Sequence, residues 1–257
     1  MHLCVKKVPR NSVGKEINMS NPGLRNLVSW WALEEDSGSA VDSHGANHLT
    51  RVGVIGNADA KQGKGIYFEN INGRYLTLAA NSTINFEHED YSIGCWYKPL
   101  GLPGGDYPKP FIHRVNDSGA ERTELFFGIP TGTTPRFSFK TRGAVVETNT
   151  AIAIGNWYFV VAWHSASENK SYLQVNNGTP VSVTDTVGGG TDHWDARFGR
   201  YITSNTHHGL NGILDEMFIY RRALNDDERS WLYNDGAGHT YTDTVLTTEN
   251  AYQINWW

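Results

Sequence analysis

Two adjacent acids lie inside an apolar run near the end of the chain. Asp215 and Glu216 stand within GILDEMFIY, residues 212–220. Branched and aromatic side chains favour strands, and a carboxylate inside a buried strand costs free energy unless a cation or a hydrogen-bond donor meets it. The pair could therefore hold a metal, act as an acid and a base in catalysis, or make a structural contact.

The expected alternation of a strand separates the two carboxylates. Neighbouring side chains of a regular strand point to opposite faces of the sheet. We therefore expect Asp215 and Glu216 not to act as one pair, and Glu216 to lie at the surface. The alternative to a metal is that one of the acids accepts hydrogen bonds from loop amides or pairs with Arg221 or Arg222.

Catalysis by paired carboxylates needs a pattern that the chain lacks. Glycosidases hold two carboxylates about 5–9.5 Å apart across a cleft. On one strand such acids would share a face, in a string such as Glu-x-Asp-x-x-Glu. The nearest string is EHED at 87–90, in a polar turn before a strand. The sequence therefore favours a protein that is not an enzyme.

Other ligand motifs are also missing. His44 and His48 are four apart but in a loop, and the side chains of the adjacent His207 and His208 diverge. His44 and His48 lack the helix that would align them on a metal. The net charge is −5, and no dense cluster of Lys and Arg occurs. These features argue against zinc and against nucleic acid as a partner.

The composition indicates a folded sheet protein. The chain of 257 residues has nine Trp, twelve Tyr and ten Phe but three Met, a balance that favours strands. It has no apolar segment long enough for a signal peptide or a membrane span. We therefore expect synthesis in the cytoplasm and no insertion into a membrane. Of the two cysteines, Cys95 is expected to be a small buried side chain.

Many short segments with turn residues between them predict strands. Asn177-Gly178 predicts a tight hairpin turn, because such a turn needs positive φ angles. Asn225 with Glu228 forms a capping-box pattern that predicts a helix over DDERSWLY, ending at Asn234-Asp235-Gly236. The expected strands are 26–33, 65–70, 73–80, 91–99, 110–115, 123–129, 135–142, 156–165, two within 170–183, 195–201 and 211–220.

We expect a single domain with two terminal segments. No repeat and no low-complexity linker divides the chain. The domain is predicted to cover 23–241, after an N-terminal extension at 1–22 and before a C-terminal arm at 242–257. The arm ends in Trp256-Trp257, and exposed aromatic residues on an arm predict docking on a partner protein or on a second copy of the chain.

Three groups of segments together resemble one known family. LVSWWALEEDSGSAVDSHGANHLT, GKGIYFENINGRYLTLAAN and YSIGCWYKP are similar to the opening of laminin G-like, concanavalin A-like jelly-roll domains. NWYFVVAWHSASENKSYLQVNNGTPV resembles the family's middle hairpin, and GLNGILDEMFIYRRALNDDERSWLYNDG its last strand and closing helix. The resemblance covers about residues 26–240. It implies an all-β fold, a two-sheet antiparallel jelly-roll sandwich with one short C-terminal helix.

The resemblance also implies a metal site. Many members of the family bind calcium near the final strand, and by position Asp42, Asn47 and Asp215 match the ligands of that site. The loop SHGANHL departs from the family's pattern, because a loop richer in glycine is typical there. Calcium prefers six to eight oxygen ligands, which two Asp side chains and loop carbonyls could supply. A structural calcium ion is therefore the cofactor to expect.

The family's members commonly bind glycans or proteins, so we expect a non-catalytic module that recognises a glycan or a cell-surface ligand. An extracellular type of domain without an export signal can still reach the outside on a virion, so we expect display on a virion or at an extracellular surface. The alternatives are a structural decoration protein of a phage capsid or tail, which assembles through its terminal arms, and a glycoside hydrolase or lyase of the same fold. Oligomers are compatible with each. The expected ligand-binding residues are Tyr107, His113, Asn116, Trp194, Tyr201 and His207.

Overall fold

The structure is a computed structural model that describes most of the domain. The described residues are 21–53, 56–69, 73–79, 83–86, 88–101, 109–115, 122–128, 135–188, 195–200 and 209–244. For 109–115 and 122–128 the description covers the backbone alone. The N-terminal extension up to residue 20 and the arm beyond residue 244 lie outside this part of the chain.

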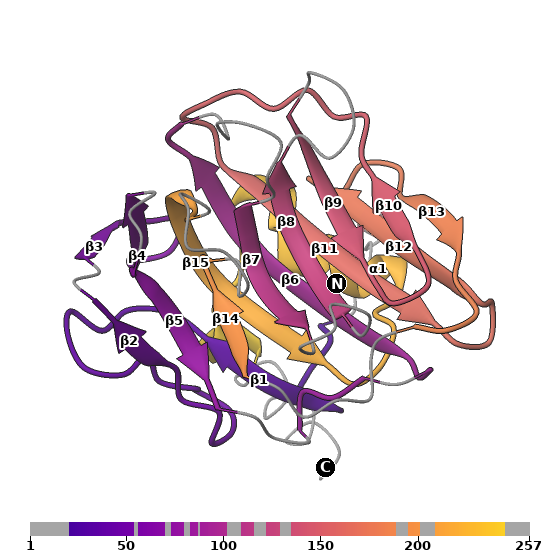
Figure 1. Ribbon diagram of the computed structural model, residues 1–257, viewed down its shortest axis with the longest axis horizontal. Helices are drawn as coiled ribbons and strands as arrows, with labels where there is room; N and C mark the ends of the chain where they lie inside the picture. Colours follow the sequence, from indigo (N-terminus) through magenta and orange to yellow (C-terminus); the bar gives the residue numbers. More distant parts are fainter. Residues whose placement is uncertain are drawn as a thin grey trace, which may run out of the picture.

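The strands form two antiparallel sheets that pack face to face (Figure 1). The eight-stranded sheet has the order β13-β12-β11-β6-β15-β4-β3, with β1 also paired to β15, and the seven-stranded sheet has the order β10-β9-β8-β7-β14-β5-β2. The strands of the first sheet are β1 (Leu27–Trp31), β3 (Gly56–Asp59), β4 (Lys64–Glu69), β6 (Tyr91–Pro99), β11 (Tyr158–Ser165), β12 (Lys170–Val175), β13 (Val181–Thr184) and β15 (Asn211–Tyr220). Those of the second are β2 (Thr50–Val52), β5 (Tyr75–Leu78), β7 (Lys109–Val115), β8 (Arg122–Gly128), β9 (Arg136–Lys140), β10 (Val145–Glu147) and β14 (Ala196–Phe198).

Apolar side chains fill the space between the sheets and also cover the far face of the eight-stranded sheet. On β11, Val160 faces the core between the sheets, whereas Phe159 and Trp163 belong to the second cluster. Both faces of this interior strand are therefore apolar. Cys95 is free and fully buried, as predicted.

The helix α1 (Asp226–Tyr233) closes the second cluster. The side chain of Asn225 accepts the amide of Glu228 at 2.9 Å, and Glu228 Oε2 accepts the amide of Asn225 at 2.8 Å. The predicted capping box is confirmed. Trp231 and Leu232 pack the helix onto the sheet, and a 3-10 turn, η1 (Asn234–Gly236), follows with left-handed backbone at Asn234.

The all-β sandwich with one short helix is confirmed, but some local predictions differ. The strands β2, β3 and β10 were not predicted; each has four residues or fewer. In the β12–β13 hairpin, Asn176 and Asn177 carry the positive φ angles, 48° and 55°, and Gly178 does not. Asparagine tolerates the left-handed conformation, so the two left-handed residues are Asn176 and Asn177, one position before the predicted Asn177-Gly178. The loop is also longer than the expected two-residue turn.

The sandwich has two open edges. At one edge β2 and β3 are joined by the Arg51 guanidinium, which donates to Asn57 Oδ1 at 3.0 Å. At the other edge β10 lies beside β12 and β13 (Figure 1). The two ends of the described domain meet elsewhere, where Asn21 Nδ2 donates to the carbonyl oxygen of Thr244 at 3.0 Å. No helix in the described ranges is long and apolar enough to span a membrane.

Candidate functional site

The acid pair on β15 lies at a β-bulge, which changes the expected directions of its side chains. The pairing of β15 with β6 shifts register between Asp215 and Phe218, and Glu216 has a φ of 45°. Leu214 and Met217, on either side of the pair, both belong to the core between the sheets. A bulge places two residues where a regular strand has one, so both acids lie on the side away from that core. The prediction of opposite faces was wrong.

Both carboxyl groups are buried. Asp215 is 0% exposed and Glu216 is 2% exposed, so the prediction that Glu216 lies at the surface was also wrong. Asp215 Oδ2 accepts the amide of Gln62 at 2.8 Å, and Glu216 accepts the indole N–H of Trp30. Burial raises the pKa of Asp215 to about 7. Burial and the neighbouring charge of Asp215 raise the pKa of Glu216 to about 9.

The contact of Asp215 with a loop amide agrees with the structural alternative. Arg221 pairs with Glu89 instead, and Arg222 pairs with Glu228 at 2.6 Å. The Oδ1 atom of Asp215 is buried and has no hydrogen-bond partner in the described part of the protein. This atom alone, among the predicted metal ligands, is an uncommitted oxygen that fits a cation.

The other two predicted metal ligands accept hydrogen bonds within their own loop and from Trp30 and Thr83 outside it. Asp42 Oδ1 accepts the amides of Trp30 and His44, each at 3.0 Å, and Oδ2 accepts the amide of Asn47 at 3.1 Å. The side-chain oxygen of Asn47 accepts the hydroxyl of Thr83 at 3.0 Å. Asp42 and Asn47 thus lie together and close their loop. A shared calcium site with Asp215 stays a prediction, and the described residues contain no group of three acidic, histidine or cysteine side chains that could hold a metal.

Most of the predicted ligand-binding residues fall outside the described part of the chain. His113 is placed by its backbone, on β7 of the seven-stranded sheet. The residues outside the described ranges are Tyr107, Asn116, Trp194, Tyr201 and His207, together with the predicted docking residues Trp256 and Trp257. Their roles stay predictions.

The register of the seven-stranded sheet places His113 in a row that crosses every strand. His113 lies opposite Glu124 of β8 on one side and opposite Arg197 of β14 on the other. Directly opposite residues of antiparallel strands share a face. From β10 to β2 the row consists of Val145, Lys140, Glu124, His113, Arg197, Thr77 and Thr50.

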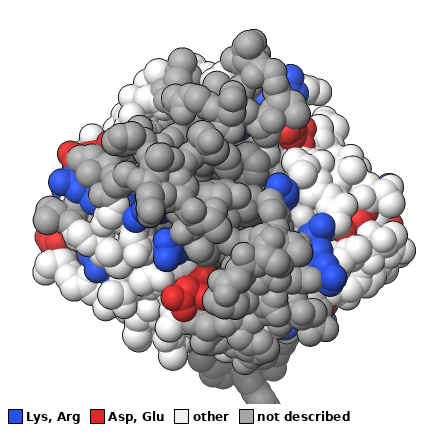
Figure 2. Space-filling model, viewed as in Figure 1, with Lys and Arg blue, Asp and Glu red and all other residues white. Residues whose placement is uncertain are grey.

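This row lies on the outer face of the sandwich. Phe139, Leu76 and Phe198 are buried in the core between the sheets, so their strand neighbours Lys140 and Arg197 belong to the opposite face. Figure 2 shows this side of the molecule, with Lys and Arg side chains at several separate places and Asp and Glu among them. We name the outer surface of the seven-stranded sheet the ligand face, after the predicted ligand-binding residue His113 in its row.

The described side chains of the ligand face include an aromatic ring beside two cations. The guanidinium carbon of Arg197 lies 5.0 Å from the ring centroid of Tyr75, and that of Arg200 lies 5.3 Å from it. Both distances fall in the range of cation–π contacts. The three side chains are partly exposed, so they form a held aromatic surface with hydrogen-bond donors around it.

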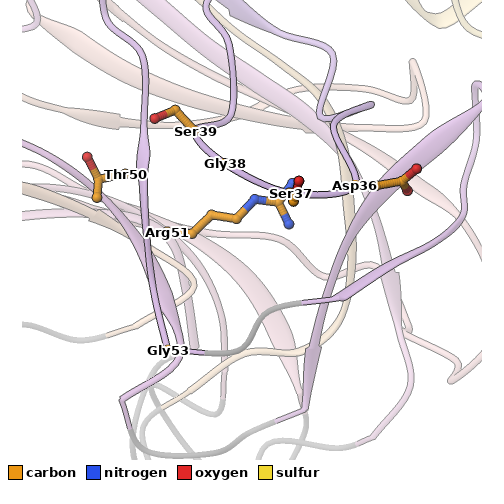
Figure 3. A pocket seen from close by; sticks show the side chains of 7 residues that line it. All are labelled: Asp36, Ser37, Gly38, Ser39, Thr50, Arg51 and Gly53. Carbon is orange, nitrogen blue, oxygen red and sulfur yellow. The ribbon is translucent and has the colours of Figure 1, made fainter.

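The row ends at β2 in a hollow of about 460 Å³, named here the sheet-edge hollow. Figure 3 shows Arg51 reaching from β2 toward Ser37, while Asp36 points away from it. Burial lowers the pKa of Arg51, against the charges of Glu35 and Asp36. The hollow therefore offers hydroxyl groups and a held guanidinium beside the ligand face. Its lining residues are Asp36, Ser37, Gly38, Ser39, Thr50, Arg51 and Gly53.

Sequence reasoning missed Tyr75, Arg197 and Arg200. Alternation in GRYLTLAA places Tyr75 and Thr77 on one face of the sheet, so the sequence could have predicted that these two residues share a face. What brings Arg197 beside them is the pairing of β14 with β5, which joins strands far apart in the chain.

A family model described as the concanavalin A-like lectin/glucanases superfamily matches residues 70–228, more than half of the chain. The chain belongs to this superfamily. The resemblance inferred from the sequence is thereby confirmed. No curated protein sequence matches the chain.

Solved structures of the same fold share little sequence with this superfamily member. The binding domain of Paraclostridial Mosquitocidal Protein 1 has a TM-score of 0.64 at 17% identity, over 82% of this chain and 52% of that one. Domain 4 of AbnA, a GH43 extracellular arabinanase from Geobacillus stearothermophilus, solved in complex with arabinotriose, has a TM-score of 0.63 at 15% identity, over 83% and 98%. A structure of botulinum neurotoxin type C, a toxin whose cell entry depends on interaction with two ganglioside molecules, has a TM-score of 0.61 at 13% identity, over 83% of this chain and 52% of that one.

These similarities show the fold. The chain spans about half the length of the mosquitocidal and neurotoxin structures and nearly the whole of the arabinanase domain. The matched region thus corresponds in fold to nearly the whole of one domain of known structure.

Proposed function

We propose that the protein is a non-catalytic carbohydrate-binding module that recognises a glycan on a cell surface through the ligand face. Similar folds support the choice of ligand, because the arabinanase domain was solved with arabinotriose and the neurotoxin interacts with gangliosides. The fold itself does not define the chemistry. The proposal therefore rests on what the ligand face presents.

The observation that carries the proposal is the contact of the partly exposed Tyr75 ring with Arg197 and Arg200 on the ligand face. A sugar ring has an apolar side that can stack on an aromatic ring and hydroxyl groups that can accept hydrogen bonds from guanidinium groups. The contacts with the two arginines hold the Tyr75 ring before a ligand arrives. A prearranged aromatic surface loses less entropy on binding than a mobile one.

The dimensions of the ligand face favour an extended ligand. Neighbouring strands lie about 4.8 Å apart, so the six steps from β10 to β2 span about 29 Å. The row has polar residues at most of its positions and ends at the sheet-edge hollow. A chain of several sugar units would therefore contact more of the face than a single sugar.

A glycan array tests the proposal directly. The wild-type protein should bind a subset of glycans, and Tyr75→Ala should lose most of that signal. Tyr67→Ala is the matched control, because Tyr67 is a partly exposed tyrosine on β4 of the other sheet. Retention of the full signal by Tyr75→Ala, or its loss in both variants, would contradict the assignment of the ligand face.

A second role, attachment to a larger assembly such as a virion, rests on the meeting of the two ends of the domain. Asn21 bonds to Thr244, and the hydroxyl of Tyr220 donates to the carbonyl oxygen of Gly23 at 3.1 Å. Residues 21 and 244, at the ends of the described range, therefore lie side by side. We expect the segments beyond them, 1–20 and 245–257, to bind the same capsid or tail partner, or a second copy of the chain. Deleting 245–257 should abolish incorporation into such an assembly while leaving glycan binding unchanged, and full incorporation of the truncated chain would contradict this role.

A further inference from the structure

A second hollow lies at the other open edge of the sandwich, lined by the segment that follows β10 and by the β12–β13 hairpin. Its volume is about 290 Å³. We name it the hairpin hollow. Its floor is apolar, formed by Leu173, Val175 and Val181, and its rim carries Asn149, Thr150 and Thr179.

The polar groups of the rim can form hydrogen bonds with a ligand. The side-chain oxygen of Asn149 accepts a hydrogen bond from Arg136 Nη1 at 3.0 Å, which leaves the Asn149 amide nitrogen as the donor. The hydroxyl groups of Thr150 and Thr179 are exposed and make no hydrogen bond within the described residues. Each hydroxyl group can both donate and accept, as the hydroxyl groups of a sugar can.

Hydrogen bonds hold the two segments that carry the rim in place. The amide of Thr148 donates to the carbonyl oxygen of Phe137 at 3.0 Å, which holds the segment before Asn149. On the hairpin side, Gln174 Nε2 donates to the carbonyl oxygen of Gly178 at 2.8 Å, and Asn177 Nδ2 donates to Ser230 of α1 at 2.9 Å. The rim is therefore prearranged, which lowers the entropy lost on binding.

Size and charge limit what the hairpin hollow can take. A volume of 290 Å³ would hold roughly ten water molecules at about 30 Å³ each, which is enough for one sugar ring and not for a branched glycan. Among the described residues, no charged side chain lines the hollow. The guanidinium of Arg136 is bonded to the Asn149 oxygen at the rim and does not itself line the hollow. A carboxylate or phosphate group inside the hollow would therefore lose its hydration without a direct cation partner, which disfavours charged ligands.

We propose that the hairpin hollow is a separate subsite for a single uncharged sugar unit, with the ring's apolar side on Val175 and Val181 and its hydroxyl groups on the rim. The Arg136–Asn149 hydrogen bond joins the hollow to the β10 end of the ligand face, since Arg136 belongs to that face of β9. The inference rests on the proposed sugar-binding function but concerns residues outside the Tyr75 cluster.

Titration of the ¹⁵N-labelled full chain with neutral monosaccharides tests the subsite. D-glucose, D-galactose and L-arabinose are the probes, with N-acetylneuraminic acid as the charged comparison. At least one neutral sugar should shift the amide signals of 148–150 and 178–179 in a saturating manner, in the millimolar range. The double variant Thr150→Val/Thr179→Val should bind about tenfold more weakly, because it loses two neutral hydrogen bonds. Thr184→Val, on the exposed side of β13, should bind as the wild type does.

The outcomes separate this inference from the proposed function. Both substituted threonines are exposed, so the variant should fold, and unchanged signals elsewhere would show it. No shift at the rim, an unaltered affinity in the double variant, or equal binding of N-acetylneuraminic acid would overturn the subsite. If glycan binding that depends on Tyr75 persists in that case, the ligand face still stands; if Tyr75→Ala has no effect while the rim responds, the ligand face fails and the subsite stands.

Discussion

Replacing Glu216 with glutamine should change how the stability of the protein depends on pH. Glu216 is 2% exposed, and burial beside Asp215 raises its pKa to about 9. The folded protein therefore keeps this proton at pH values where the unfolded chain, with an ordinary glutamate pKa, has lost it. When the folded state binds more protons than the unfolded state, stability falls as pH rises. The contribution of this proton to stability is fully present below the ordinary pKa of glutamate, and it is lost as the pH rises to about 9.

The magnitude follows from proton linkage. One proton held by the folded state alone lowers the free energy of unfolding by about 1.4 kcal/mol per pH unit. From pH 5 to pH 8 the contribution of Glu216 is therefore at most about 4 kcal/mol. Asp215, with a pKa raised to about 7, acts in the same direction up to that pH. Glutamine keeps an oxygen that can accept the Trp30 indole N–H and does not titrate.

Thermal unfolding of both proteins across this pH range, with EDTA present, is the measurement. Each kcal/mol changes Tm by roughly 2–4 °C for a chain of this size, so Glu216→Gln should gain several degrees over the wild type at pH 8 and little at pH 5. Glu168→Gln, an exposed glutamate on the loop between β11 and β12, should leave the pH dependence unchanged. Parallel Tm curves for Glu216→Gln and the wild type would refute the buried, protonated state of Glu216.

Three further predictions concern stability. Asn225→Ala should lower the free energy of unfolding by about 1 kcal/mol in denaturant titrations, because it removes the acceptor of the capping box; no loss would contradict that contact. Arg229→Ala should lower the free energy of unfolding by on the order of 3 kcal/mol, because buried groups would lose their hydrogen-bond partner. The Arg229 guanidinium lies 3.9 Å from the Trp163 ring centroid and donates to Gln174 Oε1 at 2.7 Å. A change below the error of the titration would contradict this prediction. If calcium binds at Asp215, saturating calcium should add about 2.7 kcal/mol at 100 times the dissociation constant, and identical melting curves with calcium and with EDTA would remove that prediction.

Features encoded within a few residues were predictable. The capping box needs Asn225 and Glu228 alone, and the structure shows both of its hydrogen bonds. The continuous run of apolar residues along β11 likewise places apolar side chains on both of its faces. These signals are local, because the residues that make them are neighbours in sequence and in space.

The bulge on β15 was not predicted, although the sequence holds a trace of it. Leu214 and Met217 both face the core, yet they are three residues apart, whereas a regular strand places core residues two apart. That spacing requires one extra residue, and Glu216 takes the left-handed conformation that accommodates it. The buried acid pair follows from this single departure from alternation.

The ligand face depends on strand order, which no local pattern contains. Tyr75 and Arg197 are far apart in the chain and meet because β14 pairs with β5. The pairing of β14 with β7 places His113 in the row, opposite Arg197. From the sequence alone, His113 could be proposed as one residue of a binding site, but its neighbours could not be named.

Calorimetric titration of the strongest glycan from the array tests the central claim most directly. A tyrosine at the centre of a binding surface typically contributes 2 kcal/mol or more to the binding free energy. Tyr75→Ala should therefore raise the dissociation constant roughly thirtyfold. Tyr67→Ala, on the other sheet, should bind the same glycan as tightly as the wild type. Equal affinities for Tyr75→Ala and the wild type would contradict the claim that this module binds glycans on the outer surface of its seven-stranded sheet.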